Sequence, residues 1–344
     1  MKKILFIGEL PPYSYHGISL SNQRILSVLN DRYYIHKIID KYANKGMLFS
    51  ILSILYLVSM LFCTKGGFSY LYINFPTSNL GLVKSTLLVL LSRLKCRNII
   101  VVSHLHRGDF IEYYSASLMS KILSKIFMRL SNNCLVLSRT SKNEIEKEGF
   151  SSSKITVLHN TVDVERTMLD FSFKENYIYS LSNYVKSKNL DFVIDLSLEN
   201  ANVNFYLNGS PIELDYFLYL KSKSPENCFL GERVDGVDKL SKIKNAKFLI
   251  VPSFNEGMPL IILEALSQGT PVICFNVGYI SDYLGEDYLG LVNDISFEAM
   301  NDKLSSLLDL DINEYEELSK YSYELFWSNY SPDIIKHEIL NVFQ

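Results

Sequence analysis

Residues 245–284 read NAKFLIVPSFNEGMPLIILEALSQGTPVICFNVGYISDYL. Two short apolar runs, at 248–251 and 272–275, flank an amphipathic segment at 259–268. This pattern predicts a buried strand, a helix and a second buried strand, which together form a βαβ unit with parallel strands. Ligands bind such sheets at the carboxyl ends of the strands, which here is the polar turn at 252–257. The stretch therefore predicts an α/β fold with a ligand site at this turn.

The turn carries residue types suited to an anionic ligand. Pro259 fits the first helical turn, where its missing N–H costs nothing. The free amides around Gly257 to Leu260 would then face the ligand, and a helix N-terminus favours an anion such as a phosphate. Glu256 precedes the helix and Glu264 follows about two turns later. Each glutamate alone fits a helix-stabilising or surface charge, but both of them with the glycine, the proline and the buried strands form a more specific pattern.

The segment PSFNEGMPLIILEALSQGTPV at 252–272 resembles the signature PSxxEGxPxxxxEAxxxGxPV of the family 4 retaining glycosyltransferases. The resemblance implies the GT-B fold, in which two Rossmann-like domains with parallel sheets face each other across a cleft and a C-terminal helix returns to the first domain. It also implies that Glu264 holds the donor ribose. Glu256 and the amides that follow would meet the donor sugar and its diphosphate.

The composition fits a globular chain of two domains. The chain has 344 residues, which is long enough for two hydrophobic cores. Of these residues 48% are hydrophobic and 21% are charged, as in a globular protein. The five cysteines are scattered without a C-x-x-C pair, which favours reduced thiols in a cytosolic compartment. The apolar run after Met1 is too short for a secretory signal. We therefore expect a cytoplasmic protein.

The two parts of the chain differ in charge. Residues 1–165 hold 20 Lys and Arg against 10 Asp and Glu, whereas the remainder holds 14 against 27. Either chance drift in composition or a basic surface that faces anionic lipid or a lipid-linked pyrophosphate explains the difference.

One uncharged segment of the basic part has the length of a membrane span. Residues 47–64 contain no charge. Predicted strands at 34–40 and 70–75 lie on either side, and a span would pull two strands of one sheet apart. We therefore predict a helix that packs on the sheet, partly exposed to the membrane surface.

A basic stripe recurs in the helix predicted at 110–131. Lys121, Lys125 and Arg129 are four residues apart and share one face. Such a stripe is most often a solvated face, but in a basic half it is also a candidate for contact with anionic lipid.

Two strand ends of the first half carry histidines. A loop with His16 and Gly17 follows the strand predicted at 3–8, and no G-x-G-x-x-G is present. A helix is predicted after this loop, from about Ser19 to Asn30, with Ser19 or Ser21 as its cap. The run HLHRGDF places His104 and His106 after a buried strand; they lack a third residue at metal-ligand spacing. In the resembled family a histidine after this strand, best matched by His106, lies near the donor sugar. In that family the corresponding loop lies over the donor phosphates and the acceptor, which makes His16 and Gly17 candidates, although Gly17 also suits a plain turn.

The second half carries the counterpart of the family's GRxxxxKG run. Lys188 matches its lysine, which neutralises the diphosphate, and Asn183 stands where arginine is usual. An amide donates hydrogen bonds but brings no charge, so Lys186 is a candidate for the missing cation. The segment FLGERV at 229–234 contains Arg233. In the resembled family the corresponding segment lies beside the nucleotide base. The Asp309–Asp311 pair matches a D-x-D metal motif only by chance, because no buried strand precedes it.

The resemblance also implies a division into domains and a set of site residues. We expect an acceptor-binding Rossmann-like domain at 1–168, a nucleotide-sugar-binding Rossmann-like domain at 169–326 and a closing helix at 327–344. The expected catalytic residues are Glu256, His106 and Lys188, the donor-binding residues are Glu264, Asn183, Gly257, Met258, Pro259, Leu260, Gly17 and Arg233, and the acceptor side has His16 and His104. No cofactor and no metal is required by this arrangement.

The sequence thus favours a retaining glycosyltransferase of bacterial polysaccharide, O-antigen or capsule biosynthesis. It would use a nucleotide diphosphate sugar and a lipid-linked or growing saccharide acceptor at the inner face of the plasma membrane, with no nucleic acid involved. A nucleotide-sugar 2-epimerase of the same fold and a non-catalytic nucleotide-sugar-binding partner are the alternatives.

Overall fold

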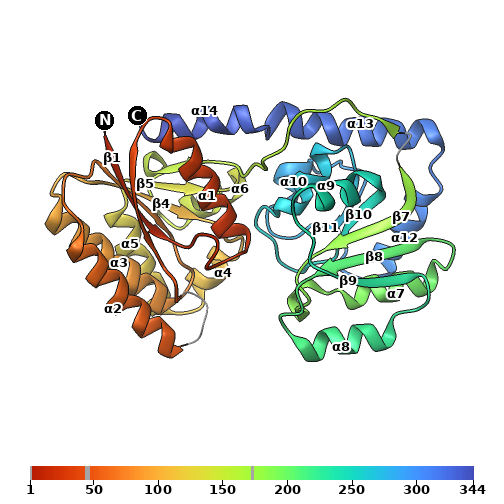
Figure 1. Cartoon of the computed structure of the whole chain (residues 1–344), viewed down its shortest axis with the longest axis horizontal. Helices are drawn as coiled ribbons and strands as arrows, with labels where there is room; N and C mark the ends of the chain where they lie inside the picture. Colours follow the sequence, from red (N-terminus) through yellow and green to blue (C-terminus); the bar gives the residue numbers. More distant parts are fainter. Residues whose placement is uncertain (1, 43–46, 172–173) are drawn as a thin grey trace. The chain divides into compact units, whose positions relative to one another are not determined.

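The computed structural model describes residues 2–42, 47–171 and 174–344 (Figure 1). The chain divides into two compact units, one formed by Met1–Asn160 with Asp333–Gln344 and the other by Thr161–Pro332. The boundaries expected at 168 and 326 lie close to these divisions, and the assignment of a function to each domain stays a prediction.

The first unit is built on a six-stranded parallel sheet of order β2-β1-β3-β4-β5-β6. Its strands are β1 (Lys3–Gly8), β2 (Tyr34–Ile39), β3 (Tyr70–Asn74), β4 (Ile100–Leu105), β5 (Asn133–Val136) and β6 (Ile155–Val157). Its helices are α1 (Gly17–Asn30), α2 (Met47–Cys63), α3 (Asn79–Lys95), α4 (Phe110–Ser115), α5 (Leu118–Leu130) and α6 (Arg139–Lys147), with a 3₁₀ turn η1 (Ser152–Lys154).

Side chains alternate between the two faces of this sheet, as the period of a strand requires. Leu5 and Ile7 of β1 face the layer formed by α2, α3 and α5, whereas Ile4 and Phe6 face α1 and the closing helix α14 (Pro332–Val342). α14 buries Ile335 and Ile339, among others, in this second core, and the Tyr33 hydroxyl donates a hydrogen bond to the Phe343 carbonyl at 2.5 Å. The expected return of the C-terminal helix to the first domain is confirmed.

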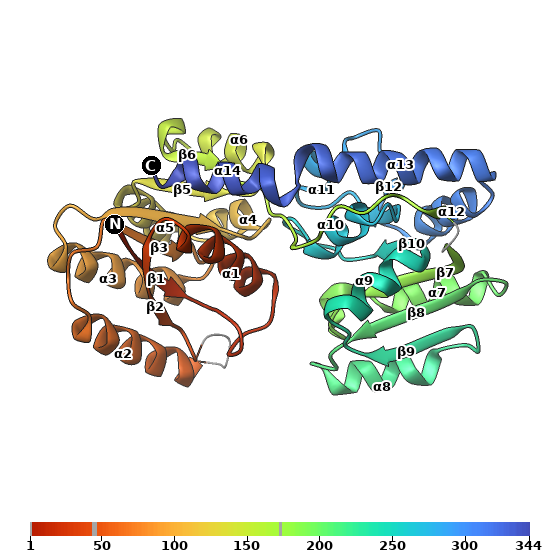
Figure 2. The same cartoon turned by 45° about the horizontal axis from the view of Figure 1, so that its top comes forward.

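The second unit repeats the plan with a six-stranded parallel sheet of order β12-β11-β10-β7-β8-β9. Its strands are β7 (Glu175–Leu181), β8 (Asn204–Gly209), β9 (Cys228–Glu232), β10 (Ala246–Val251), β11 (Val272–Phe275) and β12 (Leu291–Val292). Its helices are η3 (Lys186–Lys188), α7 (Asp191–Glu199), α8 (Leu214–Lys223), α9 (Gly236–Asn245), α10 (Leu260–Ser267), α11 (Ile280–Leu284), α12 (Phe297–Leu308) and α13 (Ile312–Asn329). Helices α7 and α8 cover one face, and α9 and α10 the other (Figures 1 and 2). The predicted α/β class and the GT-B plan of two parallel sheets are confirmed.

The βαβ unit that opened the sequence analysis is β10, α10 and β11, with small shifts at its ends. The first strand starts at Ala246, and Pro259 is the N-cap of α10 rather than part of its first turn, with φ −67° and ψ 123°. Because the backbone of Pro259 is extended, the helix begins one residue later than predicted.

The start of α1 also differs from the prediction. His16, not Ser19 or Ser21, is the N-cap, and the backbone N–H of His16 donates to the Ser19 hydroxyl at 3.1 Å in a capping box. Ser21 instead donates its hydroxyl proton to Asn160 at 2.9 Å. A serine near a helix start is therefore not by itself a cap, because tertiary partners compete for the hydroxyl.

Three further segments test predictions from the basic half and the C-terminus. Residues 47–63 form α2, and of the helices in the described part of the chain none is long and apolar enough to cross a membrane.

The prediction of a single helix at 110–131 is wrong. The chain forms two helices there, because Ser117 follows the turn after α4 and caps α5. Asp311 caps α13 by accepting hydrogen bonds from the amides of Asn313 and Glu314, which accounts for it without a metal.

Candidate functional site

The carboxyl edge of the second sheet carries an ion pair between two predicted site residues. Lys188 ends η3, directly after β7, and Glu256 lies in the turn between β10 and α10. The Lys188 Nζ and a Glu256 carboxylate oxygen are 2.6 Å apart, and the Glu256 side chain is only 11% exposed. Two residues 68 positions apart in the sequence therefore meet in front of the N-terminus of α10.

Asn189 fastens these two loops together, and sequence analysis missed it. It ends η3 in the left-handed conformation, with φ 53°, and is buried. Its side-chain amide donates to the Pro252 carbonyl at 3.2 Å. Asparagine tolerates this conformation better than most residues, so an asparagine that follows a short lysine-containing turn was the available signal.

Two glycines permit the loops of the site to approach each other closely. Gly278, after β11, has φ +57°, and a Cβ there would lie 1.8 Å from the Glu256 carbonyl oxygen. A Cβ on Gly209, at the end of β8, would lie 1.8 Å from the carbonyl oxygen of Ser182, the neighbour of Asn183. Any larger residue would push the Glu256 turn or the Asn183 loop away, so both glycines are positioning residues that the sequence analysis did not single out.

The N-terminus of α10 has no side-chain cap and no acidic residue in its first turn. Its first amides are thus not occupied by a capping side chain, which leaves them free to meet an anion. Met258, just before Pro259, is buried and holds the turn against the core. The predicted residues 256–260 therefore form one continuous rim beside Lys188.

Glu264 lies in α10 and pairs with a lysine that was not predicted. Lys239 of α9 places its Nζ 2.6 Å from a Glu264 carboxylate oxygen, and the two side chains are 19% and 13% exposed. The pKa of the Tyr179 hydroxyl is raised, first by burial and then by the neighbouring Tyr177, Tyr184 and Glu264. Nothing in the local sequence of α9 distinguishes Lys239 from its neighbours Lys242 and Lys244.

Arg233, in the loop after β9, forms hydrogen bonds of 2.8 and 2.9 Å to Asp235. The pair is largely exposed. Lys186, the candidate for the missing cation, is exposed, and its backbone N–H donates to Glu213 at 3.1 Å.

The carboxyl edge of the first sheet carries a network of neutral groups. The Tyr72 hydroxyl donates to Asn22 at 3.1 Å and lies 2.9 Å from Nδ1 of His104. Because a phenol has one proton, His104 must donate from Nδ1, which leaves its Nε2 as an acceptor. Within the described residues, the buried Nε2 atoms of His104 and His106 have no hydrogen-bond partner.

The two rings lie 3.8 Å apart between centroids. Burial, and then the neighbouring His106, lower the pKa of His104 well below its usual value. Burial, and then His16, lower the pKa of His106 to about 3. Both rings are therefore neutral at pH 7 and offer hydrogen-bonding groups without charge.

His16 and Gly17 lie at the start of α1 at the same edge. His16 Nε2 is 2.6 Å from a Glu9 carboxylate oxygen, and both side chains are partly exposed. Gly17 has open space around the position of a Cβ, so sterics do not require glycine there.

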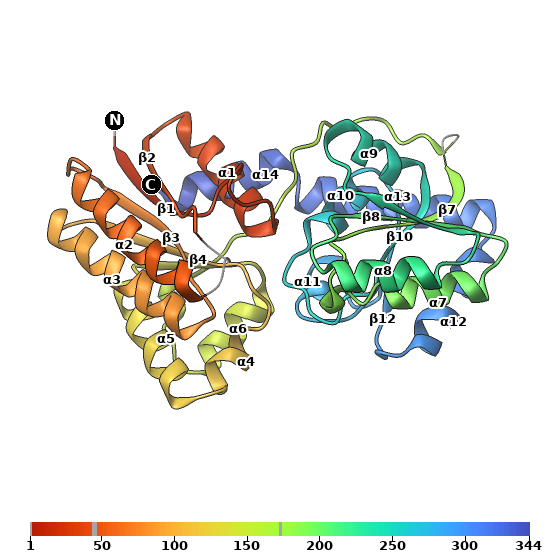
Figure 3. The ribbon, with the colours of Figure 1, turned by 60° about the horizontal axis from the view of Figure 1, so that its bottom comes forward.

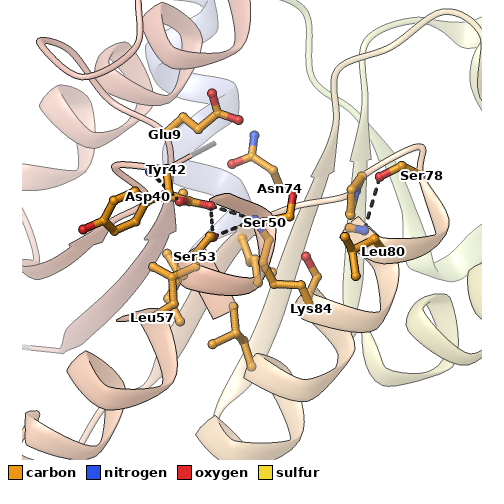
Figure 4. Close-up of a pocket in the computed structure, with 17 residues that line it drawn as sticks. Glu9, Asp40, Tyr42, Ser50, Ser53, Leu57, Asn74, Ser78, Leu80 and Lys84 are labelled. Atoms are coloured by element: carbon orange, nitrogen blue, oxygen red, sulfur yellow. Dashed lines mark hydrogen bonds and ion pairs between the residues drawn. The ribbon is translucent and has the colours of Figure 1, made fainter. Parts of the chain in front are cut away.

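A pocket of about 310 Å³ opens beside this network and was not predicted. Figure 4 shows that it lies between α2, α3 and the ends of β1 and β3, with Glu9 and Asn74 in its wall. On one side Lys84 donates to Asp40 at 2.7 Å, and Ser53 donates to the same Asp40 oxygen at 2.8 Å. Lys84, the only charged residue in positions 79–92 of the apolar α3, was the sequence signal for this pair.

The described residues contain no group of three or more His, Cys, Asp or Glu side chains that could hold a metal ion. His104 and His106 therefore lie together without a third such ligand in that part of the chain.

Comparison with known proteins gives a family and a fold. The family model described as "Glycosyl transferases group 1" matches residues 163–325. An uncharacterized glycosyltransferase of Methanocaldococcus jannaschii is 24% identical over 61% of this chain and 58% of its own length. The O-antigen chain mannosyltransferase RfbU of Salmonella typhimurium is 23% identical over 62% of this chain and 63% of its own.

Among solved structures, Anabaena HepE in complex with UDP-glucose superposes with a TM-score of 0.78 at 16% identity, covering 100% of this chain and 99% of HepE. At that identity the likeness shows the shared fold. The chain spans less than two thirds of the length of either curated relative.

Proposed function

The chain belongs to the group 1 glycosyl transferases, family 4, and from that premise we propose that it transfers a sugar from a nucleotide diphosphate sugar, with retention. The observation that carries the proposal is the Lys188–Glu256 pair in front of the uncapped N-terminus of α10. This arrangement offers a cation, a carboxylate and a helix start without a side-chain cap within one short rim.

The barrier to sugar transfer is departure of the nucleoside diphosphate. Negative charge develops on the leaving phosphate and positive charge on the sugar ring, so the rim must stabilise both. Lys188 and the backbone N–H groups of Gly257 and Leu260 serve the phosphate, because a cation and a helix N-terminus both favour an anion. Glu256 holds Lys188 in place before the donor arrives and lies on the side of the sugar.

Glu264 is proposed to accept hydrogen bonds from the donor ribose, with Lys239 orienting its carboxylate. Asn183 donates hydrogen bonds to the diphosphate where relatives of this family use arginine, and Arg233 lies on the side of the base.

The acceptor is proposed to be a lipid-linked or growing bacterial saccharide, such as that of an O-antigen or a capsule, met at the inner face of the plasma membrane. The first unit supplies His16, His104 and the 310 Å³ pocket with its hydroxyl, amide and carboxylate groups. Such neutral and internally paired groups suit the hydroxyls of a saccharide better than a free anion. The neutral His106 is proposed to hydrogen-bond the donor sugar from Nε2.

A panel of nucleotide sugars incubated with and without a membrane extract, read by mass spectrometry, tests the proposal. A sugar-bearing product in the extract supports transfer. An isomerised donor would indicate a 2-epimerase instead, and a bound but unchanged donor a non-catalytic partner.

A further inference from the structure

The outer surface of α2, α3 and α5 is apolar and exposed. The three helices lie side by side on one face of the first sheet (Figure 3). Their exposed large apolar residues, here called the apolar face, are Phe49, Ile51, Leu52, Leu55, Phe62, Leu80, Val83, Leu87, Leu90, Leu94, Leu118, Met119, Ile122 and Ile126. Large contiguous apolar surfaces of this kind mark an interaction site.

The pattern along α3 shows that the exposure is systematic. Leu80, Val83, Leu87, Leu90 and Leu94 follow one another at helical spacing of three or four residues, and all are exposed, Leu94 by 84%. A surface helix of a water-exposed protein would place polar residues there. The opposite side of the same helix is buried through Leu82 and Leu88, so α3 has apolar residues on both its inner and outer sides.

The charges of these helices are all of one sign. The sequences of α2, α3 and α5 contain no Asp or Glu, although the whole chain has a net charge of −3. Their six cations are Lys84, Arg93, Lys95, Lys121, Lys125 and Arg129. Lys84 is used inside the pocket, and the Lys121 ammonium lies over the Tyr114 ring at 5.6 Å.

Lys125 and Arg129 are exposed and share the outer side of α5 with Leu118 and Ile122. Lys95 donates to the carbonyls of Leu61 and Phe62 at the end of α2, beside the exposed Phe62 side chain. Apolar side chains mixed with long cations suit a surface whose interior is hydrocarbon and whose rim is negative. A protein partner would have to leave these cations unpaired or supply acids to match them.

We infer that the apolar face docks on the surface of a lipid monolayer that contains anionic lipid, with its leucines among the acyl chains and Lys125 and Arg129 at the head groups. This docking rests on the membrane location proposed for the enzyme but requires neither donor nor acceptor. It differs from attachment through the basic stripe alone, because apolar burial is not screened by salt.

Vesicles of phosphatidylglycerol and phosphatidylcholine, sedimented with the full chain, test the docking. The wild-type protein should bind them and remain largely bound in 0.5 M NaCl, a concentration that screens exposed charges. The combined change Leu87→Gln, Leu90→Gln and Leu94→Gln should lower the partition coefficient by about 100-fold or more, whereas Lys125→Gln with Arg129→Gln should lower it by about 10-fold to 30-fold, because each cation contributes about 1 kcal/mol.

A matched control changes exposed leucines of the second unit: Leu198→Gln, Leu214→Gln and Leu218→Gln. It should leave vesicle binding as in the wild type. Circular dichroism and nucleoside diphosphate binding confirm that each variant is folded.

Unchanged vesicle binding by the α3 variant would overturn the inference. So would a lipid-free dimer that the α3 variant abolishes while no form of the protein binds vesicles, because the face would then cover a second copy of the chain. Since vesicle binding needs no sugar transfer, failure here leaves the proposed function intact, and loss of transfer in solution leaves the docking intact.

Discussion

The carboxyl edges of the two six-stranded parallel sheets differ in strand order and have opposite chemistry. In the second unit the ion pair Lys188–Glu256 lies in front of the uncapped start of α10, and a second pair, Lys239–Glu264, joins α9 to α10. In the first unit the corresponding edge carries neutral imidazoles, a phenol and asparagine amides around His104. The two parallel sheets therefore offer one edge suited to a charged diphosphate and one suited to uncharged hydroxyls.

The charged edge should be the more sensitive of the two to loss of a single side chain. Lys188→Ala is expected to lower turnover by about 100-fold to 1000-fold, since it removes a preorganised cation beside the leaving phosphate. Steady-state kinetics with the active donor measures this. Lys221→Ala, an exposed lysine of α8, is the control and should be neutral, and Asn183→Arg should be tolerated or beneficial. Normal turnover of Lys188→Ala would mean that another cation holds the diphosphate.

At the edge of the first unit the largest effect should be on stability. Lys84→Met is expected to lower the free energy of unfolding by about 3 kcal/mol, because it leaves the Asp40 carboxylate, 5% exposed, without its cation. Urea denaturation measures the loss. Adding Asp40→Asn should recover most of it, and both variants should keep donor affinity. An equally unstable double variant would show that the pair matters through packing instead of charge.

Glu264→Gln tests the charged edge of the second unit through its affinity for the donor. It should weaken donor binding by about 1.5–3 kcal/mol while leaving the fold intact, because a charged acceptor of hydrogen bonds becomes a neutral one. Isothermal titration calorimetry measures this, with Glu317→Gln on the exposed side of α13 as control. Donor affinity equal to that of the wild type would remove Glu264 from the site.

The smallest effect concerns pH and belongs to the neutral edge. The folded His106 has a pKa of about 3, whereas the unfolded value is about 6.5. As the pH falls below 6.5 the unfolded chain takes up a proton that the folded chain refuses, so stability present above pH 6.5 is lost toward pH 3. At pH 5.5 His106 should account for about 1.4 kcal/mol of lost stability, and His104 adds in the same direction.

Urea denaturation of wild type and His106→Gln at pH 7.5 and 5.5 measures this difference. The variant should lose less stability on acidification than the wild type. Equal losses would mean that the His106 ring protonates freely in the folded protein.

The two edges also differ in how much of each could be predicted from the sequence. The βαβ unit and its glutamates lie in one continuous segment, so periodicity and spacing predicted the strand–turn–helix that holds Glu256. The return of the last helix and the fold class were also predicted. Lys188 was placed by resemblance, and its role stays a prediction; its contact with Glu256 joins residues 68 positions apart and left no local trace in the sequence.

Other features depend on contacts between distant segments and leave little local trace. Lys239 reaches Glu264 across 25 positions, and Asp40 reaches Lys84 across 44. The glycines at 209 and 278 matter because another loop approaches them, which no local pattern reveals. The exposed leucines of α3 read in sequence as ordinary core residues, because a helix that is apolar on several sides gives no sign of which side is outward.

Titration calorimetry with nucleoside diphosphates tests most directly whether the charged edge is the diphosphate site. UDP, GDP and ADP would be titrated into the wild type, Lys188→Ala, Glu264→Gln and the Asp40→Asn, Lys84→Met double variant. At least one nucleotide should bind the wild type and the double variant equally, and bind Lys188→Ala and Glu264→Gln at least tenfold more weakly. If the wild type, Lys188→Ala and Glu264→Gln bound the nucleotide with equal affinity, the assignment of the charged edge as the diphosphate site would be contradicted. A loss of affinity confined to the double variant would contradict this assignment too.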